Sequence, residues 1–251
     1  VSGFALNYAT PVGLMGGEPY RIMELTPYVG ASKATSSVIL YVMMHIFSHF
    51  CFWFFSIFLY LALRPVDIAM GTILAVVGAV SLLAIYFFMK GYKNGMAVRT
   101  LKLLQHIPFV KEWAKRFSEN KREALERVDS QIAELHKQRR STFYASLSLE
   151  FMARIIGCLE VYFILNILTT DVSFPACILI MAFTSLFANL FFFSPMQLGA
   201  REGGFALAVG GLAIPGAFGV YTGLITRVRE LIWIVIGVLL MKVGNGTPAN
   251  K

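Results

Sequence analysis

Charged residues are scarce in this chain. Of its 251 residues only 14% are charged and 57% are hydrophobic, and the mean hydropathy is +0.67. A soluble globular domain carries roughly 25% charged residues, and a soluble enzyme of this size could not bury so much apolar surface in one core. The same low charge excludes a disordered chain, and three cysteines are too few for a disulfide scaffold. The class that remains is a polytopic membrane protein, because lipid covers the apolar surface that a protein core cannot bury.

Long apolar runs predict the helices that cross the membrane. Each of the first four is as long as the ~20 residues that span the hydrocarbon, and they cover residues 34–63, 68–89, 141–168 and 172–193. A fifth run, 203–241, is interrupted by Pro215-Gly216 and by three charges, which suits a short or re-entrant segment followed by one more span. We therefore predict a single all-α membrane domain over residues 1–251, with about five full spans and one or two re-entrant or broken segments.

The positive charge is concentrated in one loop. Residues 90–140 hold 13 of the 22 Lys and Arg but only six of the 14 acids. The positive-inside rule places such a short loop in the cytoplasm, so we expect a protein of the cell (inner) membrane. Leu125, Val128 and Ile132 recur at helical spacing, which predicts a helical hairpin in this loop. The hairpin would pack on itself or at the headgroups, or it would dock a partner protein or anionic lipid. We expect no nucleic-acid partner, because topology accounts for the charge.

A nine-residue pattern occurs twice. TPVGLMGGE at residues 10–18 and SPMQLGARE at residues 194–202 share a hydroxyl residue, a proline, a leucine and a glutamate at the same spacing. Arg21 follows the first copy, and Arg201 lies within the second. Proline and glycine favour a break in a helix, and we predict structural breaks at Pro11, Gly16, Gly17, Pro19, Pro195 and Gly199.

The charges beside these breaks are the candidate site. Irregular backbone at membrane depth persists only where it is buried in protein or lines a wet cavity, and charges there are costly unless they pair or face water. Broken helices in corresponding halves of a chain point to a transporter's binding site, and the helix that starts after each break aims its positive end at an anion. We predict that Glu18, Arg21, Arg201 and Glu202 meet at one polar cavity. The alternative is that they form structural ion pairs that fix interfacial turns.

Further charges inside the apolar runs give second candidates. These are Arg154, Arg227 and Arg229. Glu160 also needs a partner, and Arg227 or Arg229 is the natural one, because an unpaired buried charge is strongly destabilising. His45 and His49 share a helix face but lack the glutamate of a metallohydrolase motif, so we favour hydrogen bonding over metal binding there. We expect no catalytic residues, no metal and no cofactor, because no nucleophile–base set and no phosphate-binding loop is present.

The two motifs also carry a resemblance. NYATPVGLMGGEPYR at residues 7–21, and SPMQLGAREGG at residues 194–204 followed by LITRVRELIW, resemble the signatures of the lysylphosphatidylglycerol synthase transmembrane-region family. The resemblance covers nearly the whole chain and lacks only the family's N-terminal helices, so we expect the natural chain to extend upstream. Met196-Gln197 departs from the family, which usually has glycines there.

The resemblance implies a flippase-like membrane protein of bacteria or archaea. In the multiple-peptide-resistance factors this region is linked to moving aminoacylated phosphatidylglycerol between leaflets, and a separate soluble domain performs the aminoacyl transfer. We therefore expect a protein that is not an enzyme and that binds or translocates an anionic or isoprenoid-linked lipid headgroup. The alternative is a non-transporting membrane scaffold that docks a partner enzyme through residues 90–140.

Overall fold

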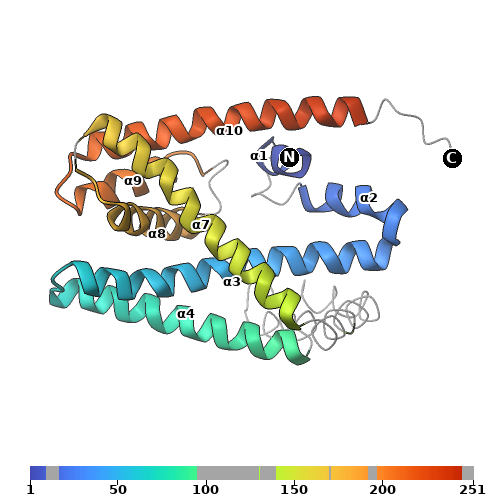
Figure 1. Cartoon of the computed structure of the whole chain (residues 1–251), viewed down its shortest axis with the longest axis horizontal. Helices are drawn as coiled ribbons and strands as arrows, with labels where there is room; N and C mark the ends of the chain where they lie inside the picture. Colours follow the sequence, from blue (N-terminus) through green and yellow to red (C-terminus); the bar gives the residue numbers. More distant parts are fainter. Residues whose placement is uncertain (10–16, 95–129, 131–139, 170, 192–196, 245–251) are drawn as a thin grey trace. The chain divides into compact units, whose positions relative to one another are not determined.

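The structure, a computed structural model, describes residues 1–9, 17–94, 130, 140–169, 171–191 and 197–244. Every regular element in these ranges is a helix, and there is no strand among them (Figure 1). The eight helices are α1 (Ser2–Ala9), α2 (Gly17–Val29), α3 (Ala31–Leu63), α4 (Ile68–Asn94), α7 (Arg140–Leu168), α8 (Phe174–Leu190), α9 (Ala200–Gly210) and α10 (Gly216–Gly244). The prediction of an all-α protein is confirmed for the described residues. Most of the predicted basic hairpin, residues 95–129 and 131–139, lies outside them.

Within the described residues, three helices are long and apolar enough to cross a membrane. They are α3, α4 over Ile68–Lys90, and α7 over Ser141–Leu168, which agree closely with three predicted spans. The fourth predicted run gives α8, an apolar helix of 17 residues, shorter than expected. In α10, 29 residues would suffice for a span, but Arg227, Arg229 and Glu230 lie within it. Large apolar side chains around them are exposed, among them Val228, Leu231 and Val235.

Local chemistry explains where the helices begin and end. As predicted, α3 ends at Leu63, just before Arg64-Pro65. The carboxylate of Asp67 accepts a hydrogen bond from the Met70 amide (2.7 Å), which caps the start of α4. Ser173 caps α8 in the same way, with Pro175 in the first turn, where no amide hydrogen bond is lost. Short polar residues thus cap the starts of α4 and α8.

The described residues group into two units, each with its own core. One unit comprises Ile22–Phe54 and Val66–Met152, and its core is formed by Met44, Phe47, Phe88 and Phe143. The other unit comprises Val1–Arg21, Phe55–Pro65 and Ala153–Lys251. Its core lies where α7, α8 and α9 pack together and includes Val161, Leu165, Cys177, Ile180, Phe205 and Val209. All the site residues discussed below belong to this second unit.

Helices α9 and α10 approach each other closely at Gly219. A Cβ placed on Gly219 of α10 would lie 2.5 Å from the carbonyl oxygen of Phe205 on α9. On the other side of α9, a Cβ on Gly204 would lie 3.3 Å from the Cα of Thr184 on α8. Small residues of this kind let helix backbones approach closely in membrane proteins. The close approach brings the charged residues of α9 within reach of those on α10.

Candidate functional site

The break between α8 and α9 creates the site. Helix α8 ends at Leu190 and α9 starts at Ala200. Gly199, directly before α9, has a φ of +79°, a left-handed conformation that glycine adopts without strain. The Glu202 carboxylate turns back and accepts a hydrogen bond from the Gly199 amide (2.9 Å). The predicted break at Gly199 is therefore present. The carboxylate of Glu202 occupies the start of α9, where we had expected a bound anion. Pro195 lies outside the described residues.

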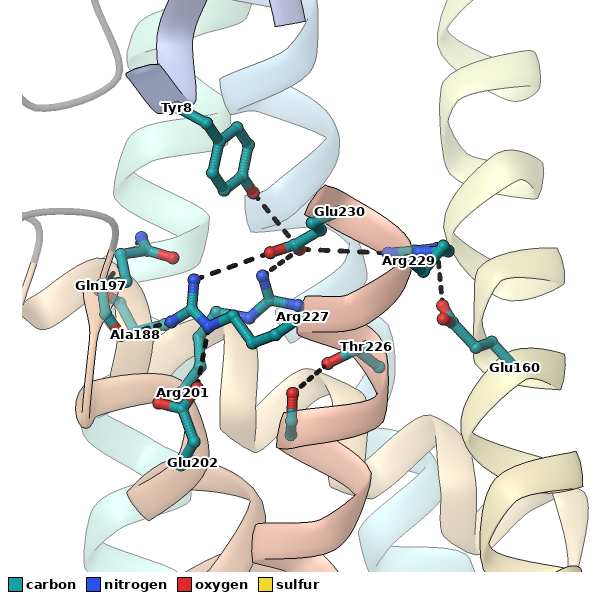
Figure 2. Close-up of polar contacts among 11 residues, drawn as sticks. Tyr8, Glu160, Ala188, Gln197, Arg201, Glu202, Thr226, Arg227, Arg229 and Glu230 are labelled. Carbon is teal, nitrogen blue, oxygen red and sulfur yellow. Dashed lines mark hydrogen bonds and ion pairs between the residues drawn. The ribbon is translucent and has the colours of Figure 1, made fainter. Parts of the chain in front are cut away.

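An ionic cluster forms beside this break. It consists of Tyr8 on α1, Glu160 on α7, Arg201 and Glu202 on α9, and Arg227, Arg229 and Glu230 on α10 (Figure 2). Arg227 donates from Nε to the Glu202 carboxylate (2.8 Å) and from Nη2 to the carbonyl oxygen of Gln197 (2.9 Å). Gln197 has a φ of +53°, and its side chain donates to the Ala188 carbonyl of α8. Arg227 thus joins α9, α10 and the turn that precedes α9.

Glu230 lies at the centre of the cluster and is only 4% exposed. Its Oε1 accepts hydrogen bonds from Arg201 Nη1 and from the Tyr8 hydroxyl (3.4 Å). Arg227 Nη1 lies 3.6 Å from Oε2, and Arg229 Nη2 lies 4.0 Å from Oε1. Within the described part of the chain, Oε2 is buried and has no hydrogen-bond partner. One carboxylate therefore faces three guanidinium groups and a phenol, as Figure 2 shows.

The edge of the cluster is more open. Arg229 Nη1 lies 2.6 Å from the Glu160 carboxylate of α7, and the Arg229 side chain is 49% exposed. The prediction that Glu160 pairs with Arg227 or Arg229 is confirmed. This pair differs from the buried ones, because an ion pair open to solvent contributes only about 0 to 1 kcal/mol.

Three arginines and three glutamates make the cluster formally neutral. Burial by itself would raise the pKa of Glu202, but the hydrogen bond and charge of Arg227 and the bond from the Gly199 amide hold that pKa below its ordinary value. Glu202 is accordingly a carboxylate at neutral pH. Because charges taken out of water are costly unless paired, this balance is what allows six ionic side chains to gather in so apolar a chain.

The first motif contacts α1. The Asn7 side chain donates to the Glu18 carboxylate (3.1 Å) and accepts from the Gly17 amide (2.6 Å). Gly17 is needed for close approach, since a Cβ there would lie 2.0 Å from the Gly3 carbonyl oxygen. Arg21 packs over Gly3, where a Cβ would lie 2.6 Å from its Nε. Tyr8, the neighbour of Asn7, reaches Glu230, so α1 links the first motif to the ionic cluster.

Replacement of Asn7 tests this link. Asn7→Ala removes both of its hydrogen bonds and should destabilise the protein by about 1 to 3 kcal/mol, since the Gly17 amide and Glu18 lose their partner. Asn7→Asp keeps the acceptor for Gly17 but sets a second carboxylate against Glu18, and it should also destabilise. Thermal unfolding in detergent measures both effects. An unchanged midpoint in both variants would show that the α1–α2 contact contributes little.

The structure brings together part of the predicted site. Arg201, Glu202, Arg227 and Arg229 lie in one cluster, whereas Glu18 and Arg21 contact α1. Arg154 lies half-buried on α7. Pro19 lies in the first turn of α2, where proline is tolerated, so it does not break this helix. Pro11 and Gly16 lie outside the described residues.

Several residues in and around the cluster were not predicted as site residues. Asn7, Tyr8, Gln197 and Glu230 all make contacts that define the site. Glu230 could have been predicted from the sequence, because it follows two arginines within an apolar run. The other three had no signal that distinguishes them from ordinary polar residues near a turn. Elsewhere, His45 lies 3.3 Å from Glu150 on α7, and its ring packs edge-on against that of His49.

Comparison with known families places the chain. The family described as the lysylphosphatidylglycerol synthase TM region matches residues 1–237. The chain belongs to this family. The resemblance carried by the two motifs is thereby confirmed, and with it a membrane protein related to lipid metabolism or transport. No curated protein and no solved structure matches the chain.

Proposed function

We propose that this protein binds the phosphate of an anionic lipid headgroup at the ionic cluster and moves that lipid between the leaflets of the cell membrane. One observation carries the proposal: three arginines from two helices gather beside a helix break in an otherwise apolar chain. Guanidinium groups suit phosphate because their planar fork donates two parallel hydrogen bonds. The proposal assigns the protein a binding and transport role rather than a catalytic one.

The edge of the cluster offers an entry point for the headgroup. Arg229 is 49% exposed, while Arg227 and Glu230 behind it are buried. A lipid phosphate would first meet Arg229 and then exchange into the inner pairs as its acyl chains remain in the bilayer. In this proposal α10 crosses the membrane, its exposed apolar residues facing lipid, and the 90–140 loop lies in the cytoplasm.

Translocation is testable with a tail-labelled fluorescent phosphatidylglycerol in phosphatidylcholine proteoliposomes. A membrane-impermeant reductant quenches only the label in the outer leaflet, so translocation appears as additional loss of fluorescence. We expect faster loss with the wild-type protein than in empty vesicles, and a several-fold slower rate with Arg229→Ala. This variant removes a half-exposed pair with Glu160 and a 4.0 Å contact with Glu230, while Arg201 and Arg227 still face Glu230, so it should remain folded.

A matched control distinguishes an effect of the arginine at the site from a general effect of positive charge on lipid movement. Arg64→Ala removes an exposed arginine at the end of α3 and should translocate lipid like the wild type. Labelled phosphatidylcholine tests selectivity, since it carries no net charge, and it should move more slowly. A wild-type rate equal to that of empty vesicles, or equal rates for Arg229→Ala and Arg64→Ala, would refute the proposal.

A further inference from the structure

The surroundings of Glu230 resemble a phosphate site that is already filled. Arg201 from α9 and Tyr8 from α1 donate hydrogen bonds to its carboxylate, and the guanidinium groups of Arg227 and Arg229 on α10 lie 3.6 Å and 4.0 Å from it. A phosphodiester oxygen pair would use the same donors, because guanidinium and phenol groups bind carboxylate and phosphate alike. Glu230 thus occupies, as an internal anion, the position that best suits the lipid phosphate.

The charge balance limits how a second anion can enter. The cluster is neutral with all three carboxylates ionised, so a bound phosphodiester would leave a net negative charge in a buried place. That charge is avoided if one carboxylate takes up a proton from water as the phosphate arrives. The charged and titratable groups around Glu230 are Tyr8 from α1, Arg201 and Glu202 from α9, Arg227 and Arg229 from α10, and Glu160 from α7.

Of the three carboxylates, Glu230 is best placed to accept the proton. Glu202 holds the Gly199 amide at the start of α9 and the Nε of Arg227, so neutralising it would release neither Arg201 nor Tyr8. Glu160 is partly exposed and has Arg229 at 2.6 Å. Glu230 is the most buried, and its Oε2 accepts no hydrogen bond within the described residues, so a proton placed there disturbs only the 3.6 Å ion pair with Arg227 Nη1. Once neutral, Glu230 releases Arg201 and Tyr8 to the incoming anion.

We propose that Glu230 is a built-in competitor for the lipid phosphate, and that each phosphate bound at the cluster is accompanied by one proton taken up on Glu230. This inference rests on the proposed function, because it specifies how the same site is regulated. Its consequence is that binding weakens as the pH rises. It also gives lipid movement a direct coupling to a proton gradient, since the proton and the anion enter and leave together.

The test measures binding of short-chain phosphatidylglycerol to the full chain in detergent as a function of pH. The phosphodiester of this probe does not titrate near neutral pH, so any dependence comes from the protein. For one coupled proton, the affinity of the wild type should fall about tenfold per pH unit at the alkaline end. Glu230→Gln should bind without this slope, and more tightly than the wild type at high pH. Glu24→Gln, which changes an exposed acid on α2, should keep the wild-type slope.

A second measurement makes the test independent of whether Glu230→Gln folds. Calorimetry of wild-type binding in buffers of different ionisation enthalpy counts protons directly, and about one per lipid is expected. Wild-type binding without proton uptake, or a Glu230→Gln variant that folds and retains the full slope, would overturn the inference while the proposed function stands. Absence of phosphatidylglycerol binding at every pH would overturn both.

Discussion

Arg201→Ala is expected to destabilise the protein by about 3 to 5 kcal/mol, the range found when one partner of a buried ion pair is removed. Arg201 donates to Glu230, and their side chains are 15% and 5% exposed. Without Arg201 the Glu230 carboxylate remains buried with one guanidinium fewer. We expect a strongly lowered midpoint of thermal unfolding in detergent. Size-exclusion chromatography after heating measures it as the loss of the folded protein peak.

The double variant Arg201→Ala/Glu230→Ala identifies the cause. If the loss in the single variant comes from an uncompensated carboxylate, removing that carboxylate should restore part of the stability, so the two effects should not add. Arg229→Ala serves as the comparison within the cluster, because its pair with Glu160 is exposed and contributes only about 0 to 1 kcal/mol, and its contact with Glu230 is longer, at 4.0 Å. Additive losses in the double variant would show that Arg201 and Glu230 act independently.

The sequence predicted the parts of this fold that depend on local physics. Apolar length located α3, α4 and α7, and Arg64-Pro65 marked the end of α3. Charges placed in apolar runs were correctly expected to seek partners, as the Arg229–Glu160 pair shows. These features follow from the cost of leaving polar groups in lipid, which acts on each segment separately.

The rest depends on which distant segments meet, and periodicity carries no such information. Tyr8 and Glu230 are 222 positions apart, and their contact requires α1 to pack against α10. Glu18 was predicted to share one polar cavity with Arg201, and the partner that the structure gives it is Asn7, only 11 positions away. The similarity of the two motifs indicated equivalent surroundings. In the structure Glu202 caps the start of α9, whereas Glu18 accepts a hydrogen bond from Asn7 of α1.

Gly219→Ala is expected to disturb the whole cluster although it introduces a single methyl group. The added Cβ would lie 2.5 Å and 2.6 Å from the carbonyl oxygen and carbon of Phe205, and 2.7 Å from the Cα of Ala206. All three atoms belong to the backbone of α9, so no side chain can rotate away and the two helices must separate. Overpacking of this kind costs about 1 to 3 kcal/mol. We therefore expect a lower unfolding midpoint and a loss of phosphatidylglycerol translocation.

The functional loss follows from where the paired side chains originate. Arg201 and Glu202 project from α9 and meet Glu230 and Arg227 of α10 across this same contact, so separating the helices lengthens both ion pairs at once. Gly210→Ala is the matched control, because Gly210 ends the same helix α9, is exposed, and would have no atom within 4 Å of its Cβ. That change should be neutral or should stabilise α9 by up to about 1 kcal/mol. Equal behaviour of the two alanine variants would show that close contact of α9 and α10 is not what holds the cluster together.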